Sequence, residues 1–242
     1  MMSFLVYLGK VAKLNKSLSG LLSSNQNSIY KEWRNQIESR KNPLDLELPW
    51  ITILAKNYIE EYLSKRSMID TRVFEYGSGG SSVFFLKYAS KVVSVEHDKK
   101  WFDLVRKRVN EKNIQGWDGY LIEPELIDNT QNNLDISNPH HYYSDDVRPF
   151  GYTFKNYASY ISNFPDQYFD IVLIDGRSRP SCLFHSVNKI KKGGLLILDN
   201  AEREHYLSQK VVSQEDFKLV ISSWGALISY NQLTKTHVYI RK

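Results

Sequence analysis

The chain of 242 residues carries 42% hydrophobic and 24% charged side chains, proportions of one ordinary globular domain that exclude a disordered or fibrous chain. Its single cysteine, Cys182, excludes an intrachain disulfide framework and any multi-cysteine zinc site, and no apolar run is long enough to span a bilayer. We therefore expect a soluble protein of a reducing compartment, the cytoplasm.

Positive charge is concentrated near the N-terminus. Residues 1–41 hold seven Lys or Arg and two Glu, so this segment accounts for the whole formal net charge of +5. The remainder of the chain is charge-balanced, and its bulk charge gives no reason to expect a nucleic-acid partner.

Residues 1–48 are predicted to form a helical arm and a linker. Apolar side chains recur at helical spacing over residues 4–22, and lysines lie on another side of the same helix. A basic amphipathic helix of this kind can lie on an anionic membrane surface, or it can pack on the domain or on a partner subunit; we favour packing. The polar residues 19–28 are predicted to be a linker, and residues 29–40 a second helix.

The predicted main domain, residues 49–242, begins with a strongly amphipathic helix, after which short apolar strands alternate with helical patterns. The predicted strands are 72–76, 91–96, 120–123, 169–175 and 194–199. The predicted helices between them are 82–88, 99–110, 155–163 and 181–190. Such alternation indicates a parallel sheet covered by helices on both faces. Segments 218–223 and 236–241 have no helix between them, which predicts a terminal antiparallel pair.

This rhythm is interrupted by residues 124–153, which are rich in Asn, Pro, His and Tyr. A connection of this length inside a compact domain is usually functional or disordered. Ligands of open α/β sheets bind outside the carboxyl ends of the strands, where this segment would emerge. We therefore predict that it is a substrate lid.

A glycine-rich turn at residues 77–82 joins the first predicted strand to a helix, and Glu75 precedes it. Glycine lets the backbone turn sharply and approach a ligand, and the following helix N-terminus offers free N–H groups. Nineteen residues after Gly77, Glu96 ends the second strand, where a carboxylate can accept both hydroxyls of a ribose. The pattern predicts a nucleotide-containing cofactor.

Two cofactors fit this layout. A dinucleotide fingerprint prefers a third glycine where this chain has Ser82, and Glu75 would repel an anionic pyrophosphate. S-adenosylmethionine (SAM) instead presents a cationic amino group and a sulfonium, whose charges Glu75 would balance. We therefore favour SAM over NAD, and a purely structural turn is the third interpretation.

These residues resemble the class I SAM-dependent methyltransferase family over most of the chain, from about Pro49 to the C-terminus. The resemblance rests on FEYGSG at 74–79, SVEHD at 94–98, DIVLIDGR at 170–177 and GGLLILDN at 193–200. More narrowly, the chain is similar to bacterial methyltransferases that carry an EYGSG, VEHD, IDGR and LDN series. The family implies a Rossmann-like, doubly wound α/β sheet of seven strands, mostly parallel with the last strand antiparallel.

The resemblance also implies roles for individual residues. Glu75, Gly77 and Gly79 would line the methionine end of SAM. Glu96 would hold the ribose, and His97 would lie near the adenine edge. The expected cofactor-binding residues are Glu75, Gly77, Ser78, Gly79, Gly80, Ser81, Glu96 and His97.

Three oxygen-bearing side chains are expected at the rim beside the turn. Asp175 ends the fourth strand, and Asp199 and Asn200 end the fifth. All three match the pattern of the metal-dependent O-methyltransferases, and hard oxygen ligands suit Mg²⁺. Gly176-Arg177 departs from that branch, which has a lysine after the first Asp. The metal-free alternative, which we favour, is that Asp175 orients SAM or the acceptor while Asp199 and Asn200 cap the next helix. These three are the candidate catalytic residues.

Arg177 and Arg203 are the candidate substrate-binding residues. Arginine recognises carboxylate or phosphate through two parallel hydrogen bonds, which suits an anionic acceptor. Surface salt bridges with Glu202 and Glu204 are the alternative.

The sequence as a whole predicts SAM-dependent transfer of a methyl group to an oxygen or nitrogen of a small, polar acceptor. One alternative is a nicotinamide-dependent oxidoreductase on a similar sheet. Another is a non-catalytic module that keeps the nucleotide pocket for binding.

Overall fold

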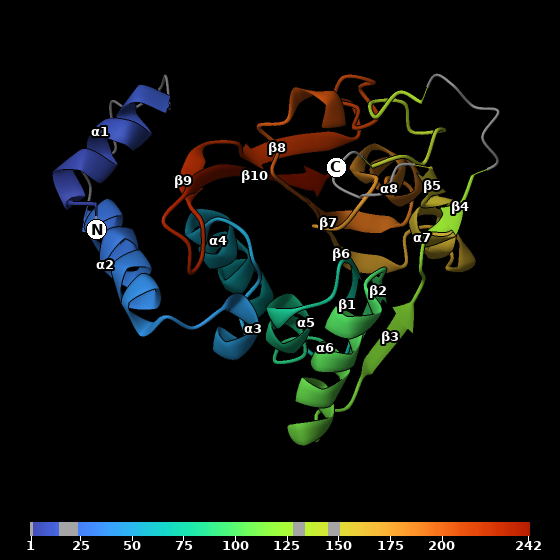
Figure 1. Ribbon diagram of the computed structural model, residues 1–242, viewed down its shortest axis with the longest axis horizontal. Coiled ribbons are helices and arrows are strands. Elements are labelled where there is room, and N and C mark those ends of the chain that lie inside the picture. The colour runs from blue at the N-terminus through green and yellow to red at the C-terminus, as the bar shows by residue number, and fades with distance from the viewer. Residues whose placement is uncertain (1, 15–23, 128–133, 145–150) are drawn as a thin grey trace.

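The computed structural model describes residues 2–14, 24–127, 134–144 and 151–242, and its centre is an eight-stranded sheet (Figure 1). The strands of this sheet are β1 (Arg72–Tyr76), β2 (Lys91–Glu96), β3 (Trp117–Leu121), β6 (Phe169–Ile174), β7 (Ile190–Asp199), β8 (Phe217–Ile221), β9 (Trp224–Ala226) and β10 (Leu233–Arg241). Their order is β3-β2-β1-β6-β7-β10-β8, and β9 pairs with β10 off this path.

Strand directions confirm the predicted sheet. β1 is parallel to β2 and β6, as are β2 to β3 and β6 to β7, whereas β10 is antiparallel to both β7 and β8. The predicted terminal antiparallel pair is therefore β8 and β10. Within the described residues, the short strand β9 is an addition that the sequence did not indicate.

Helices cover both faces of the sheet because side chains along a strand alternate between faces. In β1, Val73 belongs to the core formed with α4 (Ile53–Ser64), α5 (Gly80–Phe85) and α6 (Lys99–Glu111). Its neighbours Phe74 and Tyr76 belong to the core formed with α7 (Lys155–Ser159) and α8 (Arg179–Ser186). The doubly wound α/β architecture is thus confirmed.

The N-terminal helices α1 (Phe4–Leu14) and α2 (Ser24–Ser39) lie beside α4 and β9 (Figure 1). Trp33 is 1% exposed, and its Nε1 donates a 2.7 Å hydrogen bond to the carbonyl of Tyr230. The prediction of a linker over residues 19–28 is wrong for residues 24–28, which form the first turns of α2. Gln26 and Ile29 are buried in the folded chain. This tertiary burial stabilises a helix in a segment whose polar composition predicts a linker. Residues 15–23 lie outside the described part.

Among the described residues, no helix has both the length and the apolar composition that a membrane span requires.

Two predicted boundaries are wrong at β7. The helix predicted to reach residue 190 ends at Ser186, and β7 starts at Ile190 rather than at residue 194. Ile190 pairs with Phe169, and the register then shifts before Leu195 pairs with Ile171. The extra residues of this irregularity include Gly193, which has a φ of +73°, and Gly194, the predicted start of the strand, which lies inside it.

Residues 124–153, the predicted lid, are described in part. Their ends pair as β4 (Glu125–Leu126) and β5 (Tyr152–Thr153). Between them, the His140 ring lies 4.7 Å from that of Phe184 and Tyr142 Oη lies 3.2 Å from His185 Nε2, so the described residues contact α8. Residues 128–133 and 145–150 lie outside the described part, and a lid function stays a prediction.

Candidate functional site

The glycine-rich turn lies between β1 and α5, at the carboxyl edge of the sheet. Gly77 has a φ of +90°, and its N–H donates a 2.9 Å hydrogen bond to Val95 O at the end of β2. At Gly80, a Cβ would lie 2.3 Å from the carbonyl oxygens of Pro43 and Leu48. Glycine is required at these two positions for different reasons, conformation and close packing. The short helix α3 (Pro43–Leu46) therefore packs directly on the start of α5.

Glu75 carries a buried carboxylate beside this turn. Its Oε1 accepts hydrogen bonds from the hydroxyls of Ser82 and Ser94. Its Oε2 is buried and accepts none from any described residue. Burial raises the pKa of Glu75 to about 7. This oxygen keeps its capacity to accept a hydrogen bond.

Glu96 uses both of its oxygens to join the turn to the end of β2. Oε2 accepts from the N–H of Ser78 at 3.0 Å and from its hydroxyl at 3.3 Å. Oε1 accepts from the N–H groups of His97 and Asp98 at 2.7 and 2.9 Å. Burial raises the pKa of Glu96, but the hydrogen bonds from His97 and Asp98 outweigh it and the net shift is downward. The carboxylate is ionised, and a ribose hydroxyl would take the place of the long bond from Ser78 Oγ.

Unsatisfied polar atoms gather around the turn. Four buried side-chain atoms of the described residues lack a hydrogen bond of proper distance and angle, and three of them belong to Glu75, His97 and Tyr157. Of these atoms, His97 Nδ1 lies 2.8 Å from Glu96 Oε1, whose carboxylate is its partner, and the His97 and Tyr157 rings are 6.2 Å apart. Since a buried unsatisfied group costs about 1–3 kcal/mol, their concentration here is the expected property of a ligand site.

Trp101 and Tyr157 border this site although the sequence did not single them out. Trp101 follows the helix cap Asp98, and its Nε1 donates a 2.7 Å hydrogen bond to Ser78 O. The Trp101 ring thereby forms a wall beside Gly79. In the sequence, the position of Trp101 three residues after the helix cap Asp98 could have indicated that it lies near the turn. Nothing beyond helical spacing could have indicated Tyr157.

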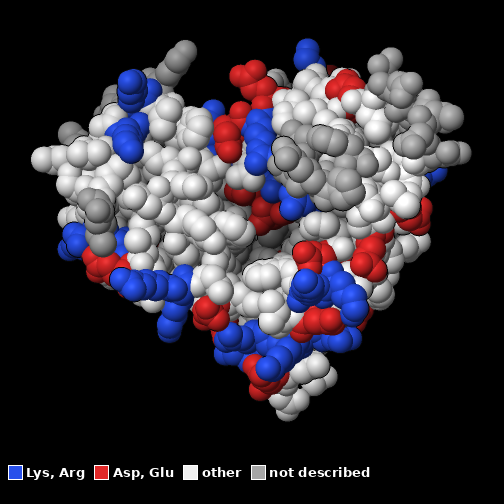
Figure 2. All heavy atoms as spheres, viewed as in Figure 1, with Lys and Arg blue, Asp and Glu red and all other residues white. Residues whose placement is uncertain are grey.

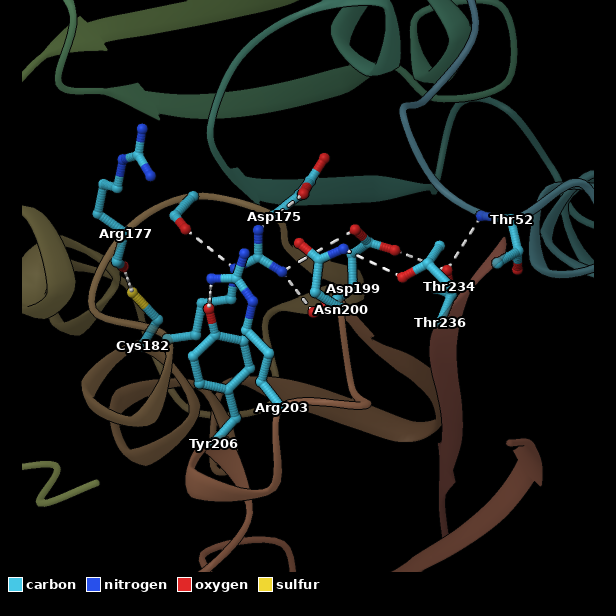
Figure 3. A network of polar contacts seen from close by, with 12 residues as sticks. Thr52, Asp175, Arg177, Cys182, Asp199, Asn200, Arg203, Tyr206, Thr234 and Thr236 are labelled. Atoms are coloured by element: carbon cyan, nitrogen blue, oxygen red, sulfur yellow. Dashed lines mark hydrogen bonds and ion pairs between the residues drawn. The ribbon is translucent and has the colours of Figure 1, made fainter. Parts of the chain in front are cut away.

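Asp175 follows β6 and Asp199 ends β7, and the two lie at one rim of the sheet (Figure 3). The buried side chain of Arg179 lies within ion-pair distance of both carboxylates. We call this rim the acceptor side, after the role predicted for Asp175, and the glycine-rich turn the cofactor side. Arg179 Nη2 lies 3.1 Å from Asp175 Oδ1, and Nη1 donates to the backbone oxygen of Asp199. Burial raises the pKa of Asp199 to about 6, and burial together with the charge of Asp199 raises the pKa of Asp175 well above its usual range. Arg179 opposes both shifts.

Asn200 and the second oxygen of Asp199 are turned toward β10. Thr236 Oγ1 donates a 2.7 Å hydrogen bond to Asp199 Oδ1, and Asn200 Nδ2 donates to Thr234 Oγ1 at 3.2 Å. The structure therefore brings Asp175 and Asp199 together through Arg179, while Asn200 is held by Thr234.

The residues present do not fit a bound divalent ion. Among the described residues, no three His, Cys, Asp or Glu side chains converge as metal ligands do. A guanidinium lies where such an ion would have to contact Asp175 and Asp199.

The two candidate substrate-binding arginines lie apart. Arg177 Nε donates a 3.2 Å hydrogen bond to His97 Nε2, and so belongs to the cofactor side. Arg203 Nη1 donates to Tyr206 Oη at 2.8 Å, and its guanidinium lies over that ring on the acceptor side (Figure 3). Figure 2 shows this face of the molecule hollowed near its centre, with acidic and basic side chains next to one another at the edge of the hollow.

The chain has the fold of the class I SAM-dependent methyltransferases. It is similar in structure to an O-methyltransferase from Bacillus cereus solved in complex with S-adenosylhomocysteine, with a TM-score of 0.55, 12% identity, and coverage of 99% of this chain and 100% of that one. A Streptococcus mutans protein, also solved with S-adenosylhomocysteine, gives 0.51 and 11% over 77% and 97%. A methyltransferase from Geobacter sulfurreducens gives 0.50 and 14% over 95% and 96%. Neither protein-family models nor curated proteins match the sequence.

Proposed function

We propose that this chain is a SAM-dependent methyltransferase acting on an oxygen or nitrogen of a small, polar acceptor. The observation that carries the proposal is the buried Glu75 carboxylate, which keeps Oε2 unbonded beside the glycine turn of a class I fold. An unpaired buried acceptor favours a cationic ligand group, as the amino group of SAM is. A dinucleotide pyrophosphate would meet the same oxygen with a like charge.

Residues on the cofactor side supply binding and orientation. Glu75 Oε2 accepts a hydrogen bond from the ligand's ammonium group, and Glu96 fixes the turn so that a ribose hydroxyl can replace Ser78 Oγ. Tyr157 Oη offers one further polar contact beside the turn. SAM, when bound, supplies the methyl group as part of a sulfonium electrophile.

Residues on the acceptor side hold and receive a proton. Asp175 Oδ1 accepts a 3.1 Å hydrogen bond from Arg179 Nη2, which fixes the carboxylate. Because burial raises the pKa of Asp175, this carboxylate is a stronger base than an exposed one. Its Oδ2 takes the proton that leaves the acceptor as the methyl bond forms. The catalytic contribution of the protein is then mainly positioning and charge stabilisation.

The acceptor that best suits this rim carries a negative charge. Arg203 brings a guanidinium to the acceptor side, where it lies over the Tyr206 ring. A carboxylate or phosphate on the acceptor would pair with the guanidinium.

Two measurements test the proposal. SAM and S-adenosylhomocysteine should raise the melting temperature of the protein, whereas NAD and NADP should leave it unchanged. With SAM bound, mass spectrometry of a panel of small hydroxy and amino acids should show one product gaining a methyl group. Stabilisation by NAD and not by SAM would contradict the proposal, and SAM binding without transfer across the panel would favour the non-catalytic module.

A further inference from the structure

The guanidinium of Arg179 is held by three acceptors. Its three guanidinium nitrogens each donate to a different acceptor: Nε to Gly176 O at 3.0 Å, Nη1 to Asp199 O, and Nη2 to Asp175 Oδ1 at 3.1 Å. The residue is 7% exposed, and its guanidinium lies 5.4 Å from the centre of the Tyr206 ring.

The backbone before α8 delivers Arg179 to this place. Ser178 has a φ of +48°, a left-handed conformation, and Arg179 is then the first residue of the helix, directly before Pro180. A side chain at the first position of a helix is directed back toward its N-terminus, here toward the ends of β6 and β7.

The carboxylates on either side have little capacity left for a metal. Asp175 Oδ1 and Asp199 Oδ2 lie 3.1 and 3.9 Å from Arg179, and Asp199 Oδ1 accepts from Thr236. A divalent ion would need several oxygens at about 2.0–2.6 Å, and it would sit against a fixed positive charge.

We infer that Arg179 is a built-in replacement for the divalent cation of metal-dependent methyltransferases: a positioning residue that holds Asp175 and Asp199 and makes the acceptor site independent of metal. The inference rests on the proposed function only where it assigns Asp175 to the acceptor. Arg179 fixes Asp175 Oδ1, and its positive charge offsets one of the two carboxylate charges. Unlike a metal ion, it cannot be removed by a chelator.

The test is Mn²⁺ binding to the full chain, measured by electron paramagnetic resonance and calorimetry. The wild type should bind no Mn²⁺ at millimolar concentration. Arg179→Met vacates the space between two carboxylates and should raise Mn²⁺ affinity at least tenfold, and adding Asp175→Asn should remove that gain. Arg179→Lys keeps a positive charge and should behave like the wild type.

Stoichiometric Mn²⁺ binding to the wild type, lost in Asp175→Asn, would overturn the inference. A folded Arg179→Met variant with no gain in Mn²⁺ affinity would also overturn it. Should Arg179→Met fail to fold, the wild-type titration and Arg179→Lys decide the question. SAM titrations of the same proteins separate the two proposals. A wild-type protein that does not bind SAM would contradict the proposed function, whereas the Mn²⁺ result would still test the inference about Arg179.

Discussion

The two halves of the site satisfy their buried carboxylates in opposite ways. On the cofactor side, Glu75 is held only by serine hydroxyls and keeps one oxygen without a partner. On the acceptor side, Asp175 and Asp199 share a buried guanidinium that belongs to the chain. The first arrangement lacks a positive charge that a ligand can bring, whereas the second already contains one. We therefore expect ligand binding to act mainly on the cofactor side, and mutation of Arg179 to act mainly on the acceptor side.

Removal of the Arg179 charge should have the largest effect. Arg179→Met removes a buried guanidinium from the buried carboxylate of Asp199 and the partly buried one of Asp175, and we expect the free energy of unfolding to fall by about 3–5 kcal/mol. Urea denaturation measures it. The control is Arg106→Met, whose ion pair with Asp103 is exposed and should contribute no more than about 1 kcal/mol. If the two variants lose the same free energy of unfolding, the Arg179 ion pairs contribute no more to stability than an exposed pair, which would contradict the prediction.

Replacement of Asp175 should separate catalysis from cofactor binding. Asp175→Asn keeps the size of the side chain and removes its capacity to take a proton, so methyl transfer should fall by about 10²-fold or more. SAM affinity should change little, because Asp175 is bonded to Arg179 and not to the turn. Steady-state kinetics with calorimetry checks both, with exposed Asp166→Asn as control. Full activity in Asp175→Asn would make the residue structural.

Glu96 should matter for the cofactor alone. Glu96→Ala removes charge-assisted hydrogen bonds to the turn, and SAM binding should weaken by roughly 1.5–3 kcal/mol. Glu111→Ala, which removes an exposed carboxylate with one weak ion pair, should leave the affinity unchanged. Calorimetry on folded variants measures the difference, and unchanged affinity in Glu96→Ala would remove the ribose assignment.

The smallest effect is a pH dependence that arises at Glu75. With a folded-state pKa of about 7 against an ordinary 4.5, the folded protein binds the proton more tightly than the unfolded one. Its contribution to stability is therefore fully present below pH 4.5 and is lost as the pH rises toward 7. A ligand ammonium favours the ionised form, so SAM binding at pH 7 should release about half a proton.

Calorimetry in buffers of different ionisation enthalpy measures that proton release. Glu75→Gln cannot ionise and should release none. Release of the same number of protons by the variant and the wild type would place the proton elsewhere.

The places of the residues expected to bind the cofactor could be predicted from the sequence because their determinants are local. Gly77, Glu75 and Glu96 stand at the ends of two adjacent strands. Their contacts lie within the same short segments, because Glu75 accepts from serine hydroxyls of the following helix and the next strand, and Glu96 accepts from backbone N–H groups. The alternating strands and helices likewise fixed the sheet, since a period of two along β1 already assigns Val73 and Phe74 to opposite faces. These features need no knowledge of side-chain direction.

The acceptor side could be predicted only as a set of residue types. Asp175 and Asp199 were expected at one rim, but the place of Arg179 depends on the left-handed Ser178 and on where a long side chain turns. The Trp101 and Tyr157 contacts depend on ring packing in the same way. Residues 24–28 show the converse, because tertiary burial of α2 made a helix from residues that individually favour a linker.

The most direct measurement is a calorimetric titration of the wild-type protein with SAM in the presence of EDTA. The cofactor side lacks a positive charge, and the acceptor side supplies its own. We therefore predict that SAM binds one-to-one and that excess Mg²⁺ does not strengthen its binding. No binding of SAM, or binding that appears only when Mg²⁺ is restored, would contradict this division of the site.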